Sequence, residues 1–222
     1  MVAGQGRATW GYRLGPVCLC ALALSASPVA AQDSRIAEGL PLAEIDLGGF
    51  ALRIERAQDP AAMLSGEFAR TARACPPFCI QPIRVAPGVA TLGELELIAF
   101  LQEQVASGAG LLIDARLPEW HAKGTIPGAV NVPFATLAPD NPLREDLLLA
   151  LGVTRLGEGQ YEFSAAMEIA LFCNGAWSDQ APLALQYLLE AGYPPEKLRY
   201  YRGGMQDWQV LGLTVAPPGQ QG

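Results

Sequence analysis

Between residues 91 and 215, short apolar runs alternate with longer segments whose apolar residues recur at helical spacing. The runs span four or five residues and are bounded by Gly, Pro or polar residues, which is typical of buried strands. Helices inserted between such strands produce a parallel sheet covered on both faces. We therefore predict a small α/β domain. Its strands are predicted at residues 111–114, 129–132, 169–172 and 198–201.

The helices between these strands have recognisable starts and ends. Thr91, with Glu94 three residues later, fits a capping box that opens the first long helix. Asp179 (or Ser178) fits the N-cap of a second long helix, and Gly192 ends it. A short helix or turn is predicted at residues 118–123, a last helix at 205–211, and an irregular insertion at 137–166.

Residues 32–90 lack this alternation, and we predict an irregular arm that packs on the α/β domain. Residues 32–47 are polar and mixed, so we expect them to be loosely held. Residues 50–54 alternate with period two, which predicts a half-buried strand. Residues 60–73 are predicted to carry a short helix. Four prolines between residues 75 and 88 make that stretch extended and stiff.

The first thirty residues have the pattern of a targeting segment. Arg7 and Arg13 precede an apolar run at residues 17–26, and small residues follow up to Ala31. This order is typical of a cleavable secretory signal peptide, and the run is too short for a lasting membrane span. We expect cleavage after Ala31 and a periplasmic or secreted protein with no membrane span in its mature chain. The predicted organisation is a signal peptide at 1–31, an N-terminal extension at 32–90, an α/β domain at 91–216 and a tail at 217–222.

Charge narrows the range of partners. The 222 residues include 15 Lys or Arg and 22 Asp or Glu, so the net charge is −7. An acidic balance disfavours nucleic acid and anionic membranes as partners. His121 is the one histidine, which excludes metal sites that need several histidine ligands. We therefore predict no nucleic-acid partner and no metal site.

The cysteine count singles out one thiol. Cys18 and Cys20 lie in the predicted leader, so the mature chain keeps Cys75, Cys79 and Cys173. In an oxidising compartment Cys75 and Cys79 are close enough in sequence to form a disulfide, which leaves Cys173 unpaired. We expect a structural bridge. A redox-active pair is the alternative, because small-loop disulfides are often reducible.

Cys173 stands at the tip of a predicted strand, five residues before a predicted helix. Loop N–H groups and the positive end of the helix can then converge on its sulfur. Such a setting lowers the pKa of a thiol below the usual ~8.5, so we expect an exposed nucleophile that is ionised near neutral pH. The alternative is a buried strand-end cysteine without chemistry, since free cysteines are often buried.

Four stretches of the α/β domain form a further pattern. Residues 112–116 end a strand in Asp-x-Arg, and residues 124–131 read Gly-Thr-Ile-Pro-Gly-Ala-Val-Asn. Residues 173–178 have the length of a six-residue loop, and residues 201–208 contain Gly-Gly-x-x-x-Trp. In this order, the stretches resemble the rhodanese family of single-domain sulfurtransferases over residues 91–215.

The resemblance implies a mechanism and a set of site residues. In that family a cysteine at the position of Cys173 takes a sulfane sulfur, becomes a persulfide and passes the sulfur to an acceptor. Loop amides hold the anionic sulfur, so no cofactor is implied. Asp114 is expected to be structural. The residues expected to contact the substrate are Asn174, Gly175, Ala176, Trp177, Ser178 and Arg116. For Arg116 the favoured alternative is a fold-stabilising pair with Asp114.

Three departures from the family pattern bear on the substrate. Thr125 stands where the family often has histidine, and the loop contains no Lys or Arg to bind a small anion. Asp179 adds a nearby negative charge, which raises the pKa of a thiol and weakens anion binding. We therefore expect thiosulfate to be a poor sulfur donor.

Three hypotheses about function follow. The first is an exported sulfurtransferase that carries sulfur on Cys173 and exchanges it with a small sulfur donor or a protein thiol or persulfide. The second is a non-catalytic module that binds a partner protein, with Trp177 as a contact anchor. The third is a thiol–disulfide protein in which Cys75 and Cys79 exchange with Cys173, in contact with a periplasmic redox partner.

Overall fold

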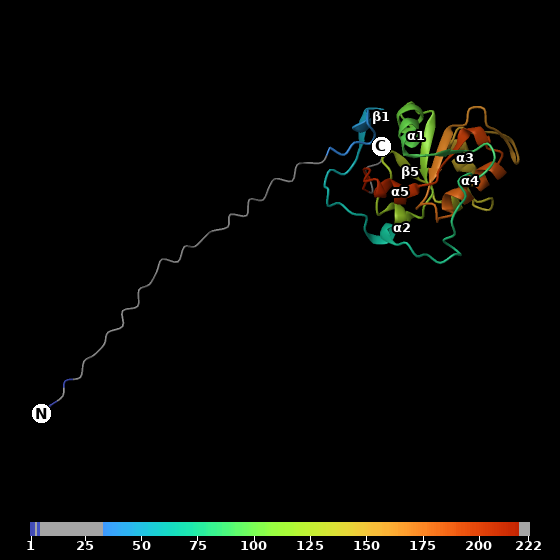
Figure 1. The fold of residues 1–222 in the computed structure, drawn as a ribbon. Coiled ribbons are helices and arrows are strands. Elements are labelled where there is room, and N and C mark those ends of the chain that lie inside the picture. The colour runs from blue at the N-terminus through green and yellow to red at the C-terminus, as the bar shows by residue number, and fades with distance from the viewer. Residues whose placement is uncertain (3, 5–32, 218–222) are drawn as a thin grey trace. The chain divides into compact units, whose positions relative to one another are not determined.

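A five-stranded parallel sheet forms the centre of the fold (Figure 1). The computed structural model describes residues 1–2, 4 and 33–217. The chain divides into the units Met1–Ala30 and Ala31–Gly222, and the sheet lies in the second. Its strand order is β3–β9–β8–β4–β5, and every neighbouring pair is parallel. The strands are β3 (Ala90–Leu92), β4 (Gly110–Asp114), β5 (Ala129–Asn131), β8 (Glu168–Phe172) and β9 (Leu198–Tyr201).

Helices cover both faces of this sheet, so the predicted α/β fold is confirmed. One face carries α3 and α4, and the other carries α1, its π-helical continuation η2, and α5 (Figure 1). Along β8, Ile169 and Leu171 enter the first core, whereas Ala170 and Phe172 enter the second. The helices are α1 (Glu94–Phe100), η2 (Leu101–Val105), α2 (Pro118–His121), η3 (Phe134–Leu137), α3 (Arg144–Ala150), α4 (Gln180–Glu190), η4 (Pro195–Lys197) and α5 (Gly204–Val210).

One predicted helix start is right and the other is wrong. Asp179 is the N-cap of α4, as predicted. At α1 the N-cap is Gly93, whose N–H donates to the carboxylate of Glu96 at 3.1 Å. Thr91 instead lies in β3, a strand that the sequence did not reveal, because three residues give too little periodicity.

The extension contains more structure than we predicted. β1 (Leu42–Leu47) and β2 (Phe50–Glu55) form an antiparallel hairpin, so the prediction that residues 32–47 are loosely held is wrong. Ala43 and Ile45 of β1 and Ile54 of β2 are buried in the core on the α1 side. Burial of one hairpin face explains the order. Residues 56–89 are irregular as predicted, except for the short 3-10 helix η1 (Gly66–Ala69), which replaces the helix expected at 60–73.

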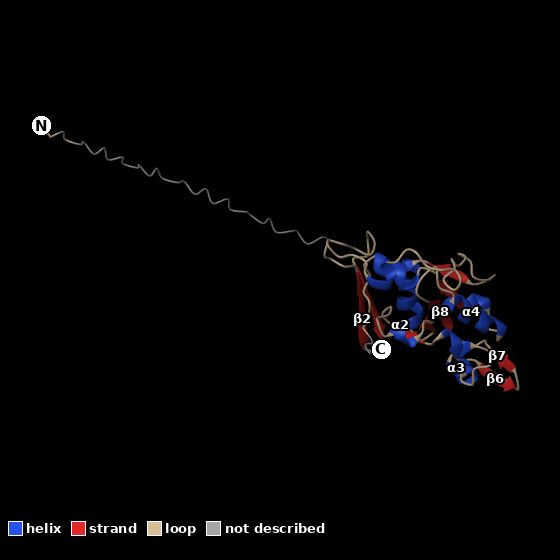
Figure 2. Ribbon diagram, turned by 90° about the horizontal axis from the view of Figure 1, so that it is seen from below, coloured by secondary structure: helices blue, strands red, loops and turns tan. Residues whose placement is uncertain are grey.

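The insertion predicted to be irregular is also ordered. It contains α3 and a second hairpin, made of β6 (Thr154–Gly157) and β7 (Gln160–Glu162). Figure 2 shows this hairpin beside α3, on the side of the fold away from β2. Leu148 and Leu151 anchor α3 in the core on the α4 side.

The predicted leader lies almost entirely outside the described residues, as do residues 218–222. Within the part of the chain that is described, no helix is long and apolar enough to cross a membrane.

Candidate functional site

Cys173 follows β8 directly, at the carboxyl edge of the sheet where ligands bind in such folds. It is the free cysteine of the described chain, as predicted. Only 1% of the residue is exposed, however. The prediction of a sulfur open to solvent is therefore wrong for this conformation.

The loop of residues 174–178 turns tightly around the sulfur. The Cys173 thiol donates to the carbonyl oxygen of Ser178 at 3.5 Å. Asn174, Gly175 and Ser178 are buried, whereas Ala176 and Trp177 are partly exposed. The backbone of the loop therefore closes over the thiol, and the Trp177 side chain packs against the core on the α1 side.

The electrostatic setting of Cys173 is mixed. Burial is the largest influence and raises the pKa of the thiol. Hydrogen bonds to the sulfur from the Ser178 hydroxyl and from the N–H groups of Ala181 and Gly175 lower this pKa but do not offset burial. The net pKa is raised, so the predicted shift to a lower pKa is wrong. The amide cradle is nevertheless present, and burial is what outweighs it.

Residues 66–86 of the extension, which we call the strap, contact the loop and its neighbours. In Figure 1 the strap is the teal-to-green segment that passes along the lower edge, below α5, α2 and α4. The Gln81 N–H donates to the carbonyl of Ala176, within the loop, at 2.7 Å. Arg202, just after β9, donates to the Gln81 carbonyl at 3.0 and 2.8 Å. Gln206 of α5 donates to the carbonyl of Phe68 at 2.8 Å.

Trp177 is the side chain through which the strap and the loop meet. The guanidinium carbon of Arg73 lies 3.5 Å above the Trp177 ring, and the Phe78 ring meets that ring edge-on at 5.5 Å. The Trp177 indole N–H donates to Gln206 at 2.6 Å. The cation that the loop itself lacks is thus brought beside the loop by the strap. Sequence reasoning missed this, although two phenylalanines and three arginines in a stretch with a single acid were a usable signal.

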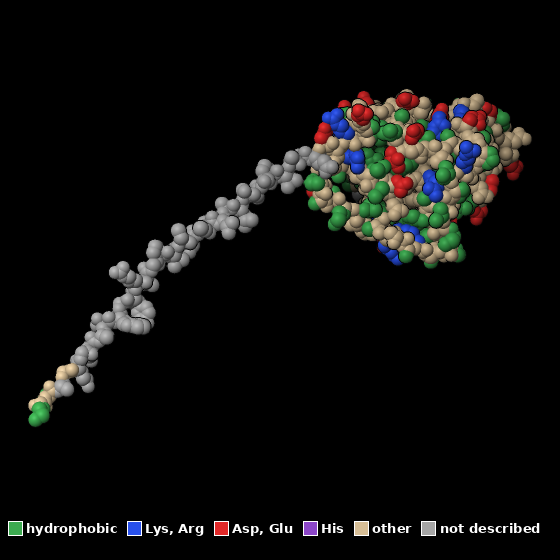
Figure 3. All heavy atoms as spheres, in the orientation of Figure 1, with side chains coloured by type: hydrophobic (Ala, Val, Ile, Leu, Met, Phe, Trp, Pro, Cys, Tyr) green, Lys and Arg blue, Asp and Glu red, His purple; other side chains and the backbone are tan. Residues whose placement is uncertain are grey.

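Hydrophobic side chains remain exposed on the strap itself. Ile80 is 83% exposed and Ile83 is 67% exposed. In Figure 3, hydrophobic and basic side chains gather along the lower edge, where the strap runs in Figure 1.

The strap also contains the predicted disulfide. Cys75 and Cys79 are joined, with 4.6 Å between their Cα atoms. The bridge closes a turn that presents Phe78 to Trp177. A redox role for this pair stays a prediction.

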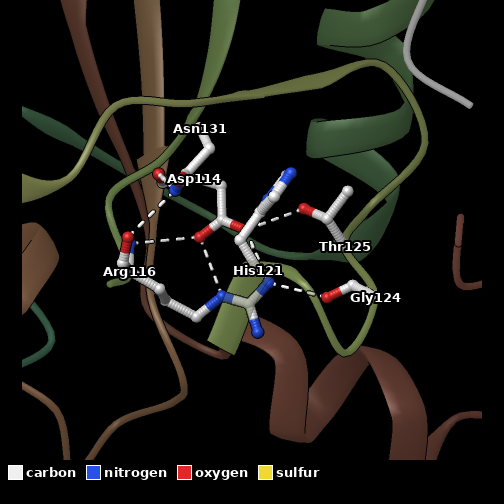
Figure 4. A network of polar contacts seen from close by, with 6 residues as sticks. All are labelled: Asp114, Arg116, His121, Gly124, Thr125 and Asn131. Carbon is white, nitrogen blue, oxygen red and sulfur yellow. Dashed lines mark hydrogen bonds and ion pairs between the residues drawn. The ribbon is translucent and has the colours of Figure 1, made fainter. Parts of the chain in front are cut away.

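A second polar cluster follows β4, the strand beside β8 (Figure 4). The Asp114 carboxylate receives hydrogen bonds from Arg116 at 2.8 and 2.5 Å and from the Thr125 hydroxyl at 2.8 Å. Arg116 also donates to the carbonyl of Gly124 at 2.7 Å. Arg116 is only 1% exposed and its guanidinium is directed at these groups, so the geometry favours a fold-stabilising pair with Asp114. A contact between Arg116 and a substrate stays a prediction. The structural role expected for Asp114 agrees with this geometry.

Two further side chains complete this cluster. His121 Nδ1 lies 2.9 Å from the Asp114 carboxylate, and the Asn131 amide donates to the carbonyls of Asp114 and Arg116, both at 2.9 Å. Burial alone would raise the pKa of Asp114, but hydrogen bonds from Arg116 and His121 outweigh it and hold the pKa below its ordinary value. Asp114 is therefore a fixed anion.

Three residues of the loop, α4 and β9 carry unsatisfied polar atoms, in contrast to the Asp114 cluster. Among the described residues, Asn174 Oδ1, Gln180 Oε1 and the Tyr200 hydroxyl are buried without a hydrogen-bond partner. Tyr200 was not predicted as a site residue, because an apolar strand position carries no signal of its own. No group of three potential metal-ligating side chains occurs in the described part of the chain.

Comparison with known proteins agrees with this architecture. Residues 97–211, more than half of the chain, match the family described as "Rhodanese-like domain". The chain belongs to the rhodanese-like domain family. The matched residues include the Asp114 cluster, the Cys173 loop and α5, but not the strap.

The similar proteins differ in their overall organisation. An HTH-type transcriptional regulator of Mycobacterium tuberculosis is 32% identical over 109 residues, which is 49% of this chain and 38% of that protein. The rhodanese-like chain thus matches well under half of that relative's length.

Two solved structures of sulfurtransferases resemble the fold. The thiosulfate sulfurtransferase of Pseudomonas aeruginosa is 22% identical with a TM-score of 0.42, over 60% of this chain and 21% of that one. A human single-domain sulfurtransferase is 24% identical with a TM-score of 0.37, over 56% of this chain and 96% of that one. The fold assignment rests on the family match and on the sheet topology.

Proposed function

We propose that this rhodanese-like protein is an exported sulfurtransferase in which Cys173 carries sulfane sulfur as a persulfide. The Cys173 thiolate attacks the outer sulfur of a donor persulfide, a new S–S bond forms, and the donor's S–S bond breaks. The donor leaves as a thiolate with the electron pair. An acceptor thiolate then attacks the outer sulfur on Cys173 and regenerates the Cys173 thiolate, so no external oxidant is needed.

The observation that supports this proposal is the cradle around the Cys173 sulfur. The Ser178 hydroxyl and the N–H groups of Gly175 and Ala181 all favour the anionic sulfur. Burial opposes them. In this proposal the strap, which bonds to the loop through Gln81 and Ala176, maintains part of that burial. Displacement of the strap lowers the pKa of Cys173 and opens its path to a donor. Sulfur transfer therefore requires an open state of the strap.

The same geometry bears on the donor. Asp179 stands at the N-terminus of α4, at the end of the loop, where its charge disfavours a small dianion. Thiosulfate is accordingly a poor donor in this proposal, and a persulfide or a protein thiol is the expected partner. Export is part of the proposal because the sequence begins with a predicted leader and the strap holds a disulfide.

A non-catalytic partner-binding module is the second candidate, and the burial of Cys173 favours it. In that case the strap and Trp177 form a fixed surface and the sulfur has no turnover. Replacement of Cys173 by serine separates the two: a binding module keeps its partner, whereas a transferase loses sulfur transfer altogether.

The test is sulfur loading measured by mass spectrometry. The wild type, Phe78→Ala and Cys173→Ser are each incubated with glutathione persulfide, inorganic polysulfide or thiosulfate. With glutathione persulfide or polysulfide we expect one added sulfur atom on the peptide containing Cys173 in the first two proteins, faster in Phe78→Ala, and none in Cys173→Ser. With thiosulfate we expect little loading of any of the three proteins.

Two results would overturn the proposal. Absence of added sulfur in both cysteine-containing proteins with every donor would leave only the binding module. Peptides in which Cys173 is linked to Cys75 or Cys79 would replace sulfur transfer by disulfide exchange.

A further inference from the structure

We propose that the Tyr200 hydroxyl donates a hydrogen bond to the outer sulfur of the Cys173 persulfide and thereby stabilises the sulfur-loaded state. The inference rests on the proposed function and adds a second residue to that site. It begins from the position of Tyr200 in β9, the strand that neighbours β8 on the side away from β4.

The register of the sheet brings the two residues to one face. Tyr200 pairs with Leu171 of β8. Side chains two residues apart on a strand lie on the same face, so Cys173 follows Leu171 on the face of Tyr200. All three residues belong to the core on the α4 side, which agrees with this placement. A tyrosine one diagonal step away on a neighbouring strand is within side-chain reach.

The hydroxyl of Tyr200 is unusual among the buried tyrosines. Tyr200 is 0% exposed, and its hydroxyl finds no partner among the described residues. By comparison, the Tyr193 hydroxyl donates to the carbonyl of Met167 at 2.6 Å, and the Tyr201 hydroxyl donates to Glu94 at 2.9 Å. A buried donor without a partner is unfavourable, and one that persists calls for an unseen partner.

The charges near Tyr200 indicate what that partner is. Burial raises the pKa of its phenol most, and the anionic form of Cys173 raises it further, whereas the Arg202 cation lowers it. The phenol therefore stays protonated at neutral pH and remains a donor. The two charges that act on the Tyr200 phenol belong to Cys173 and Arg202, and both residues follow the carboxyl ends of their strands. An anion held at Cys173 is the acceptor that this setting favours.

The persulfide supplies such an acceptor where the bare thiol does not. Its outer sulfur extends one S–S bond beyond Cys173 and is anionic near neutral pH. Tyr200 donates a hydrogen bond to this sulfur without transferring its proton. When an acceptor thiolate attacks the outer sulfur, the electron pair of the breaking S–S bond moves onto Cys173, and the hydrogen bond ends as the sulfur departs.

Tyr200→Phe removes the hydroxyl alone, and Tyr193→Phe is the matched control because its hydroxyl has a structural partner outside the loop. Each protein is equilibrated with mixtures of glutathione persulfide and glutathione, from both directions, and the fraction of Cys173 that carries sulfur is measured by mass spectrometry. A hydrogen bond to a charged sulfur predicts that Tyr200→Phe shifts this equilibrium about tenfold toward the thiol. Tyr193→Phe is expected to leave it unchanged.

Urea unfolding of the unloaded proteins provides a second measurement. Tyr193→Phe should lower the midpoint because it loses a hydrogen bond, whereas Tyr200→Phe should not. An unshifted persulfide equilibrium in Tyr200→Phe, or a midpoint lowered as much as in Tyr193→Phe, would overturn the inference. Failure of the wild type to accept sulfur would instead remove the proposed function.

Discussion

The polar clusters that follow β4 and β8 are equally buried but differ in how their polar atoms are satisfied. Asp114 and Arg116 satisfy each other and neighbouring groups, and the cluster is closed by its own hydrogen bonds. Cys173 is closed by a strap from outside the family match, and Asn174 and Tyr200 beside it keep unpaired polar atoms. The comparison indicates that burial alone does not identify a functional site. Unsatisfied polar atoms and a loop bonded to a segment outside the family match distinguish the β8 edge from the β4 edge.

Asp114→Asn is expected to have the largest effect on stability among the variants that test this comparison. The change removes the carboxylate that Arg116 needs and leaves a buried cation without a counter-charge, which typically costs about 3–5 kcal/mol. The free energy of unfolding, measured by urea denaturation, should fall by that amount. Arg53→Gln is the control, because its ion pair with Glu55 is exposed at both ends and such pairs contribute roughly 1 kcal/mol or less. A loss no larger than in the control would mean that the Asp114 cluster is not a fixed structural unit.

The sequence predicted those features that depend on a local pattern of several residues. Four of the five sheet strands, the α4 cap at Asp179 and the Cys75–Cys79 bridge were predictable because periodicity, capping chemistry and cysteine parity each depend on local pattern. β1 was not, because its order comes from packing against the α1 face of the domain. Long-range burial leaves little trace in a polar-looking segment.

The candidate site also has properties that the sequence alone does not predict. The position of Cys173 at a strand end was predictable, but its exposure and pKa were not. Burial is the largest influence on the pKa, and the loop that closes over the sulfur is bonded to Gln81, about ninety residues earlier in the chain. That contact is a backbone hydrogen bond from Gln81 to Ala176, which no side-chain pattern encodes. The buried position of Arg116 likewise follows from its contact with the carbonyl of Gly124, a backbone group.

The free energy of unfolding should depend on pH differently for the two clusters: the Asp114 cluster affects it at acid pH and Cys173 affects it at alkaline pH. The lowered pKa of Asp114 contributes stability above the unfolded value of about 3.9, and this is lost as pH falls through the folded value. The raised pKa of Cys173 has the opposite sign. Its contribution is complete below the ordinary thiol pKa of about 8.5 and is lost as the pH rises above it.

Cys173→Ala isolates the alkaline part of this prediction. Above pH 9, the wild type should lose up to about 1.4 kcal/mol of unfolding free energy per pH unit more than the variant, because one thiol must ionise. Urea midpoints between pH 7 and pH 10 measure this difference. Parallel pH profiles for the two proteins would show that the thiol is not held neutral in the fold.

Loosening the strap is expected to have the smallest effect in energy, yet it tests the cover directly. Phe78→Ala removes a ring that meets Trp177 edge-on, a contact that contributes about 0.5–1.5 kcal/mol. Loss of this contact should shift the opening equilibrium of the strap by the same free energy. Alkylation of Cys173 by iodoacetamide should therefore accelerate by roughly two- to tenfold. Ile80→Ala is the matched control, because this strap residue is 83% exposed. Equal rates in all three proteins would mean that the strap does not govern access to the sulfur. The two clusters would then differ only in whether their buried polar atoms have hydrogen-bond partners.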